Sequence, residues 1–171
     1  MDRIGIFGGS FDPVHNGHIG IAKNAIDELS LDALFVIPAA VSPFKVSNYP
    51  TFSDEARLEL LRIAFEDINK VIIDSRELTK GGISYAIDTV REIIAEYPGS
   101  ELFFIIGEDS LSGLPRWKEY DELKKLCSFK VYPRTKESST EIRRLLSNGE
   151  RLTSFVGDRL ENVIIKLWGA K

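Results

Sequence analysis

The chain has 171 residues, of which 43% are hydrophobic and 28% are charged, as in an ordinary globular protein. A net charge of −4 argues against a nucleic-acid partner, because protein surfaces that bind nucleic acids are normally basic. The same charge is compatible with binding of a small nucleotide. The single cysteine, Cys127, excludes an intrachain disulfide, and no apolar run is long enough to cross a membrane or to form the core of a signal peptide. We therefore expect one cytoplasmic domain over residues 1–171, with no membrane partner.

Short apolar runs alternate along the chain with stretches of helical periodicity. The runs predict β-strands at residues 3–7, 33–38, 70–74, 101–107 and 128–132, most of them too continuously apolar for a half-exposed sheet. Three apolar stripes predict helices, and their members are Ile19, Ala22, Ile26 and Leu29; Leu58, Leu61 and Phe65; and Ile87, Val90 and Ile94. The alternation predicts an α/β fold, a Rossmann-like doubly wound parallel sheet with helices on both faces.

Helix boundaries have their own signals. Ser53 and Ser84 are expected to cap the starts of the second and third helices, and Pro98-Gly99 ends the third. A last helix is expected at about residues 156–167, with its apolar side in the core.

Both histidines of the chain lie in one run, Gly-Gly-Ser-Phe-Asp-Pro-Val-His-Asn-Gly-His at residues 8–18, between the first strand and the first helix. Glycines allow close backbone approach to a ligand, and a helix N-terminus favours anions. His15 and His18 can donate to the same phosphate. The run has neither the G-x-G-x-x-G fingerprint nor the Lys-Ser/Thr ending of a P-loop. We interpret it as a phosphate site, the alternatives being two solvent-exposed imidazoles or, with less support, a metal site.

Further polar clusters follow the other strands, at residues 39–45, 81–85, 108–117 and 138–143. In an open parallel sheet the ligand lies beyond the carboxyl ends of the strands, so these clusters are expected to share one site. Lys45 is either a phosphate contact or a loop lysine. Asp109 is either a ribose ligand or a helix cap. Trp117 either stacks on a flat ring or belongs to the core.

The cluster Ser-Ser-Thr-Glu-Ile-Arg at residues 138–143 opens another helix, which ends near Asn148-Gly149. Ser138 and Glu141 have the spacing of a capping box. The three hydroxyls, with Arg143 one turn inside the helix, also form a second candidate anion clamp. Two such helix starts suit a polyphosphate chain.

The first run resembles the His-x-Gly-His signature of the nucleotidylyltransferase superfamily, and residues 138–143 resemble its second signature. Over residues 3–146 the chain is similar to the bacterial nicotinate mononucleotide adenylyltransferases, through Ser-Pro-Phe-Lys (42–45), Ile-Ser-Tyr-Ala-Ile-Asp-Thr (83–89) and Gly-Glu-Asp-Ser-Leu-Ser-Gly-Leu-Pro-Arg-Trp (107–117). The resemblance implies transfer of an adenylyl group from ATP, with Mg²⁺ carried by the ATP, to nicotinate mononucleotide. The products are nicotinate adenine dinucleotide and pyrophosphate.

The resemblance also implies roles for individual residues, and it implies no metal-ligand set on the protein. The catalytic residues are His15, His18 and Arg143. The ATP-binding residues are Gly8, Gly9, Ser10, Phe11, Gly107, Asp109, Ser138, Ser139 and Thr140. The mononucleotide-binding residues are Lys45, Ser84, Tyr85, Ala86 and Trp117.

The chain departs from the family pattern in two places. Only residues 135–137 separate the Tyr-Pro-Arg of residues 132–134 from Ser138, where the family has a further strand. Ala86 replaces a threonine that helps to bind the nicotinate carboxylate. An acceptor such as nicotinamide mononucleotide or phosphopantetheine therefore stays open, as does a non-catalytic nucleotide sensor. The sequence also leaves a homo-oligomer open.

Overall fold

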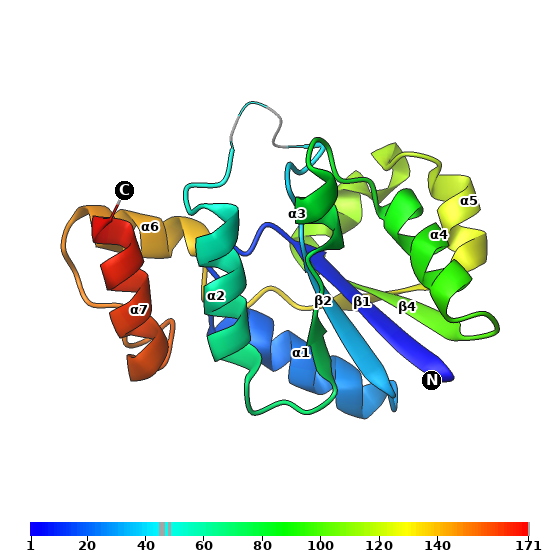
Figure 1. Ribbon diagram of the computed structural model, residues 1–171, viewed down its shortest axis with the longest axis horizontal. Coiled ribbons are helices and arrows are strands. Elements are labelled where there is room, and N and C mark those ends of the chain that lie inside the picture. Colours follow the sequence, from blue (N-terminus) through cyan, green and yellow to red (C-terminus); the bar gives the residue numbers. More distant parts are fainter. Residues whose placement is uncertain (45–46, 48, 171) are drawn as a thin grey trace.

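The computed structural model describes residues 1–44, 47 and 49–170 (Figure 1). Its elements, in chain order, are β1 (Arg3–Gly9), α1 (Asn16–Glu28), β2 (Ala33–Pro38), α2 (Asp54–Phe65), β3 (Val71–Ile73), α3 (Arg76–Lys80), α4 (Ala86–Glu96), β4 (Glu101–Gly107), the 3-10 helix η1 (Glu108–Arg116), α5 (Tyr120–Leu126), β5 (Ser128–Tyr132), α6 (Ser139–Ser147) and α7 (Asp158–Gly169). All five predicted strands are present, and β1 continues two residues beyond its predicted end.

The five strands form one parallel sheet in the order β3-β2-β1-β4-β5. The chain leaves the central strand β1 in one direction, toward β2 and β3, and then crosses to β4 on the other side. This reversal is the switch point at which open α/β sheets bind ligands. The last pairs of the ladders, Gly9 with Pro38 and Gly107 with Tyr132, bring the loops after these strands to the same edge. The predicted doubly wound parallel sheet is confirmed.

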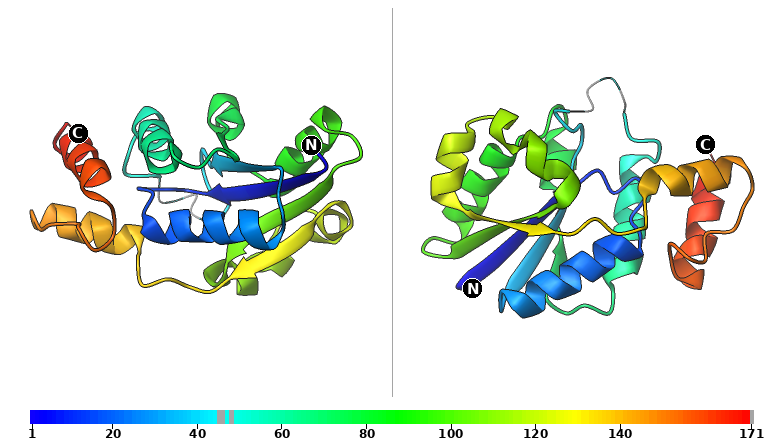
Figure 2. Two further views of the ribbon diagram at one scale, coloured as in Figure 1. Left: turned by 90° about the horizontal axis from the view of Figure 1, so that it is seen from below. Right: turned by 180° about the vertical axis from the view of Figure 1, so that it is seen from behind.

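Each face of the sheet buries its own hydrophobic core. On one face, Phe7 belongs to a cluster with buried residues of α1, α2, α6 and α7. On the other face, Ile4 and Ile6 belong to a cluster with residues of α4, η1 and α5. Alternate residues of a strand point to opposite faces, so β1 contributes to both cores. Figure 2 shows α1 lying along the strands, with α6 and α7 beyond the side of the sheet opposite α4 and α5. None of the helices described is long and apolar enough to span a bilayer.

Two helix starts are capped by the serine side chains that the sequence indicates, and a third is not, because its serine hydroxyl bonds elsewhere. The Ser53 hydroxyl accepts the amide N–H of Ala56 at 3.2 Å, and the Ser138 hydroxyl accepts that of Glu141 at 3.3 Å, as the sequence predicts. The prediction that Ser84 caps a helix is wrong, because α4 begins after Tyr85. The Ser84 hydroxyl accepts the amide N–H of Ala40 at 3.0 Å instead, a donor from the loop after β2 that local pattern cannot show.

The buried side of α2 differs from its predicted apolar stripe. The buried residues are Ala56, Arg57, Leu60, Leu61 and Phe65, whereas Leu58 is only partly buried. The predicted stripe is confirmed at Leu61 and Phe65 but not at Leu58, where the neighbouring Arg57 takes the core position, and an arginine does not count toward an apolar pattern. Similarly, α4 buries Ile93 fully in place of Ile94. The last helix begins at Asp158 and places Leu160 and Ile164 in the core, as expected.

Candidate active site

The two histidines lie against each other at the start of α1. Their rings stack with centroids 3.8 Å apart, and the amide N–H of His15 donates to Nδ1 of His18 at 3.2 Å. Because Nδ1 of His18 accepts this bond, the neutral ring carries its hydrogen on Nε2. One helix turn thus holds both imidazoles in a single orientation, as the spacing of three residues predicts.

His15 is 6% exposed, and its burial lowers the pKa from 6.5 to about 4, against a smaller opposing effect of Glu137. Its Nδ1 atom is buried and has no hydrogen-bond partner among the residues that the structure describes. Native proteins rarely leave a buried polar atom in that condition outside functional sites. His15 is therefore a neutral imidazole in a partly unsatisfied environment.

The burial of His15 has a measurable effect on stability. Between about pH 6.5 and about pH 4 the unfolded chain protonates this imidazole but the folded chain does not, so protonation favours unfolding. We expect His15 to subtract about 3 kcal/mol from the free energy of unfolding as the pH falls through this window. Urea unfolding of the wild type and of His15→Gln, at about pH 7 and about pH 4.5, measures the effect. The wild type should lose more stability than the variant; equal losses in both proteins would contradict the assignment.

Gly17, between the two histidines, has no room for a side chain. A Cβ atom there would lie 2.2 Å from Oγ1 of Thr135 and 3.0 Å from Nδ1 of His15. Thr135 belongs to the short segment 135–137, which leads directly from β5 to α6. The shortened segment therefore packs against Gly17, between the two histidines.

The loop after β1 is held in a strained conformation. Phe11 has a φ of +44°, in the left-handed region that residues with a Cβ rarely adopt. Its ring is buried between Phe7, with centroids 5.4 Å apart, and His18, with centroids 4.9 Å apart. A Cβ at Gly9 would approach the same ring to 3.2 Å. Phe11 thus acts as a packing anchor that fixes the glycine loop beside the histidines, a role the sequence did not indicate.

Helix α6 contacts this loop through its first turns. Arg143 donates from Nη1 to the carbonyl oxygen of Asp12 at 2.6 Å, and from Nη2 to Oγ1 of Thr140 at 3.3 Å. The Ser139 hydroxyl donates to the carbonyl oxygen of Pro13 at 2.8 Å. Nη1 also lies 3.5 Å from the Asp12 carboxylate, which accepts the amide N–H groups of Thr51 and Phe52 at 2.8 Å each. The two predicted anion-binding helix starts therefore meet at one place.

The cluster after β3 lies next to the loop after β2. Besides the Ser84–Ala40 bond, Val41 and Ile83 form an isolated parallel bridge. Ala86 is the first residue of α4, and the ammonium of Lys118 lies 4.5 Å from the centre of the Tyr85 ring. These predicted mononucleotide residues thus share one neighbourhood. Lys45, predicted to belong with them, lies outside the described residues.

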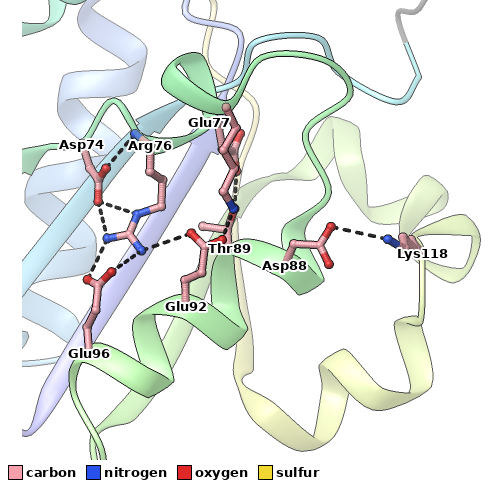
Figure 3. Close-up of polar contacts among 9 residues, drawn as sticks. Asp74, Arg76, Glu77, Asp88, Thr89, Glu92, Glu96 and Lys118 are labelled. Carbon is pink, nitrogen blue, oxygen red and sulfur yellow. Dashed lines mark hydrogen bonds and ion pairs between the residues drawn. The ribbon is translucent and has the colours of Figure 1, made fainter.

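A network of polar side chains fastens α3 to α4 behind this neighbourhood (Figure 3). Glu77 accepts the Thr89 hydroxyl at 2.6 Å, and burial raises the pKa of its carboxyl group. Arg76 pairs with Asp74 at 2.7 Å and with Glu96 at 2.9 Å. Arg76, Glu77 and Glu96 did not stand out in the sequence, because each one alone is typical of an exposed helix.

The residues after β4 lie at the same edge of the sheet. Trp117 is partly buried, with its ring edge-on to Phe104 at 5.4 Å and to Phe129 at 6.0 Å between centroids. Asp109 is exposed and lies 3.8 Å from Nε of Arg134, while Gly107 ends β4. The aromatic contacts of Trp117 fit the core interpretation, and its role in ligand stacking stays a prediction.

The described part of the chain contains no group of three or more His, Cys, Asp or Glu side chains placed to hold a metal ion.

Comparison with known proteins places this geometry in context. A cytidylyltransferase-like family model matches residues 6–156. The chain is 38% identical to a protein of Aliarcobacter butzleri (strain RM4018) named "Probable nicotinate-nucleotide adenylyltransferase", over 82% of the chain and 76% of that protein. It is 35% identical to a protein of the same name from Listeria monocytogenes serotype 4a, over 99% of the chain and 98% of that protein. That second alignment spans 189 positions, so the Listeria protein has residues that this shorter chain lacks.

The fold is also that of solved structures. The Plasmodium falciparum nicotinic acid mononucleotide adenylyltransferase complexed with NaAD superposes with a TM-score of 0.81 over 100% of this chain and 99% of that one, at 17% identity. The same enzyme complexed with APC superposes with a TM-score of 0.78, also at 17% identity. At 17% sequence identity, these superpositions show a shared fold and nothing further.

Proposed function

The chain belongs to the cytidylyltransferase-like family and, within it, to the nicotinate-nucleotide adenylyltransferases, and on that basis we propose that it transfers the adenylyl group of ATP to nicotinate mononucleotide. The products are nicotinate adenine dinucleotide and pyrophosphate, a step of NAD biosynthesis. The observation that best supports the proposal is the contact between the two helix starts. Arg143 of α6 donates a hydrogen bond to the carbonyl oxygen of Asp12, which lies three residues before His15. Each helix start favours an anion, so the two together suit the several phosphates of ATP.

The reaction needs little covalent assistance from the protein. An oxygen of the mononucleotide phosphate attacks the α-phosphorus of ATP, the bond from that phosphorus to the bridging oxygen breaks, and pyrophosphate leaves. The attacking phosphate is already anionic near neutral pH, so no general base is required. Positioning of the two phosphates and neutralisation of the charge that develops between them supply the catalysis.

We assign the residues to this chemistry as follows. His15 and His18 donate to the α-phosphate, together with backbone N–H groups near Gly9 and the Ser10 hydroxyl. Arg143 and the N–H groups of residues 138–140 hold the β- and γ-phosphates. Mg²⁺ enters as part of the MgATP substrate, which fits the lack of a carboxylate cluster among the described residues.

The rest of the edge of the sheet accommodates the two nucleosides. Gly107 and Asp109 are assigned to the adenosine. Ser84, Tyr85, Ala86 and Trp117 are assigned to the mononucleotide, with Lys45 as a further phosphate contact. Residue 86 begins α4, so its backbone N–H lies at a helix N-terminus even without the hydroxyl of a threonine. We therefore expect Ala86 to permit recognition of a carboxylate.

Pyrophosphate release tests this function directly. The purified chain is supplied with MgATP and, in separate reactions, with nicotinate mononucleotide, nicotinamide mononucleotide or phosphopantetheine. We expect release with nicotinate mononucleotide and at least tenfold less with its amide, since one charge and a few hydrogen bonds separate the two. Equal release with both mononucleotides would overturn the specificity. A folded protein that binds ATP but releases no pyrophosphate with any acceptor would be a nucleotide sensor.

Trp117 offers a separate test of the mononucleotide side. Trp117→Ala should raise the KM for the mononucleotide about tenfold and the KM for ATP by less than about twofold, because a stacked ring contributes about 1 kcal/mol or more to only one ligand. Steady-state kinetics with each substrate varied in turn measure both constants. Phe129→Leu is the matched control, since it alters the same aromatic cluster from β5. Equal rises of both KM values in Trp117→Ala would place the tryptophan in the core alone.

A further inference from the structure

Arg57 is a fully buried charged side chain that neither the sequence motifs nor the proposed reaction uses. Its relative exposure is 0%, and its one ion-pair partner among the described residues, Asp54, has a half-exposed carboxylate 2.6 Å from Nη2. Its Nε atom is buried and has no hydrogen-bond partner in the described part of the chain. Enclosing a guanidinium with incomplete pairing is costly, so fold stability alone gives a poor reason for its position.

The Nη1 atom of Arg57 joins the two loops that leave the central strands. It donates to the carbonyl oxygens of Ser10, after β1, and of Ala39, after β2, each at 2.8 Å. The amide N–H of Ala39 donates in turn to the carbonyl oxygen of Gly9 at 2.9 Å. One buried cation thus fixes the backbone of both loops at the edge of the sheet where the candidate site lies.

The direction of each peptide group follows from these two bonds. In a trans peptide the C=O and N–H groups point in opposite directions. With the Ser10 carbonyl turned toward Arg57, the N–H of Phe11 points away from it, and this N–H has no hydrogen-bond partner within the described part of the chain. With the Ala39 carbonyl held likewise, the N–H of Ala40 points away and meets the Ser84 hydroxyl.

We propose that Arg57 is a positioning residue for the transfer reaction: it turns the Ser10–Phe11 peptide so that its N–H binds an ATP phosphate, and through Ala40 it places Ser84 on the mononucleotide side. This inference rests on the proposed function. The strained φ of Phe11 is consistent with it, because such a backbone persists only where its surroundings fix it. A cation at the carbonyl end of the peptide also increases the positive character of the N–H end, in a site shielded from water.

Two variants of Arg57 and one control separate this role from a purely structural one. Arg57→Lys keeps the charge but replaces the planar fork with one ammonium, which cannot reach both carbonyls and Asp54 in the same geometry. Arg57→Met removes the charge and keeps most of the volume. Asp54→Asn alters the ion-pair partner that the structure gives Arg57 and leaves the carbonyl contacts in place.

The measurements are the dissociation constant and binding stoichiometry of MgATP by titration calorimetry, and kcat per binding-competent site. We expect kcat to fall about tenfold in Arg57→Lys and about a hundredfold in Arg57→Met, and both variants should bind MgATP several-fold more weakly. In Asp54→Asn, kcat should change less than twofold. A structural role alone would lower the melting temperature and the stoichiometry, but not the kcat per competent site or the affinity of the folded fraction.

Three results would overturn the proposal. One is a kcat per competent site within threefold of wild type in Arg57→Met, or in Arg57→Lys if the methionine variant does not fold. Another is equal damage in Asp54→Asn, which would assign the effect to the ion pair. The third is wild-type MgATP affinity in Arg57→Lys. This last measurement needs no turnover, so it tests Arg57 even if the wild type releases no pyrophosphate and the proposed function fails.

Discussion

Replacing His18 with alanine should lower kcat by about 10²–10³-fold while leaving the melting temperature near that of the wild type. The size is that of one lost donor to an oxyanion in a transition state. The effect on stability should be small because the His18 ring is partly exposed, although it stacks on His15 and lies edge-on to Phe11. Pyrophosphate release under saturating MgATP and mononucleotide measures kcat, and circular dichroism during heating measures the melting temperature.

His18→Asn serves as the companion variant, because its amide can still accept the His15 N–H and donate one hydrogen bond. It should recover part of the lost rate. A His18→Ala enzyme that turns over at close to the wild-type rate would show that the assignment of His18 to the α-phosphate is wrong. A large fall in melting temperature would mean that the loss of rate reflects misfolding.

Replacing Arg143 with methionine should lower kcat by about a hundredfold and raise the KM for ATP. The guanidinium bridges the Asp12 carbonyl and the Thr140 hydroxyl, so the change removes both a charge near the proposed phosphates and the attachment of α6 to the loop after β1. Arg143→Lys should recover little of the rate, since a single ammonium cannot form the same fork. Initial rates with ATP varied at saturating mononucleotide give both constants.

The next residue on the same helix supplies the control for Arg143. Arg144 is exposed and pairs with Glu141 at 2.7 Å and with Glu150 at 3.4 Å, away from the loop after β1. Arg144→Met removes the same charge from the same helix and should change kcat by less than twofold, since exposed ion pairs contribute little. Equal losses in the two methionine variants would indicate a general electrostatic effect instead of a phosphate contact.

The sequence predicted the sheet well because its signals are local and strong. Every apolar run became a strand, and the parallel arrangement follows from the alternation of strands with helical segments. Ser53 and Ser138 could be identified as caps because their partners are three residues away. Ser84 could not be placed, because its donor is 44 residues distant in the chain.

Distance along the chain also separates the parts of the candidate site that could be predicted from those that could not. The histidine pair lies within one helix turn, so its spacing was enough to bring the rings together. Arg57 and Thr135 contact the site only through the tertiary fold, and their neighbours along the chain give no indication of it. The one local clue for Arg57 is its position three and four residues before Leu60 and Leu61, on the apolar side of α2.

The Arg143–Asp12 hydrogen bond joins residues 131 positions apart. As the chain is synthesised from its N-terminus, β1, α1 and the histidine pair emerge long before α6 exists to meet them. Contacts of such long range tend to form late, after the entropy of closing the intervening chain has been overcome. A nascent or C-terminally cleaved chain that lacks α6 should therefore have no turnover, and the appearance of activity would report the completion of folding.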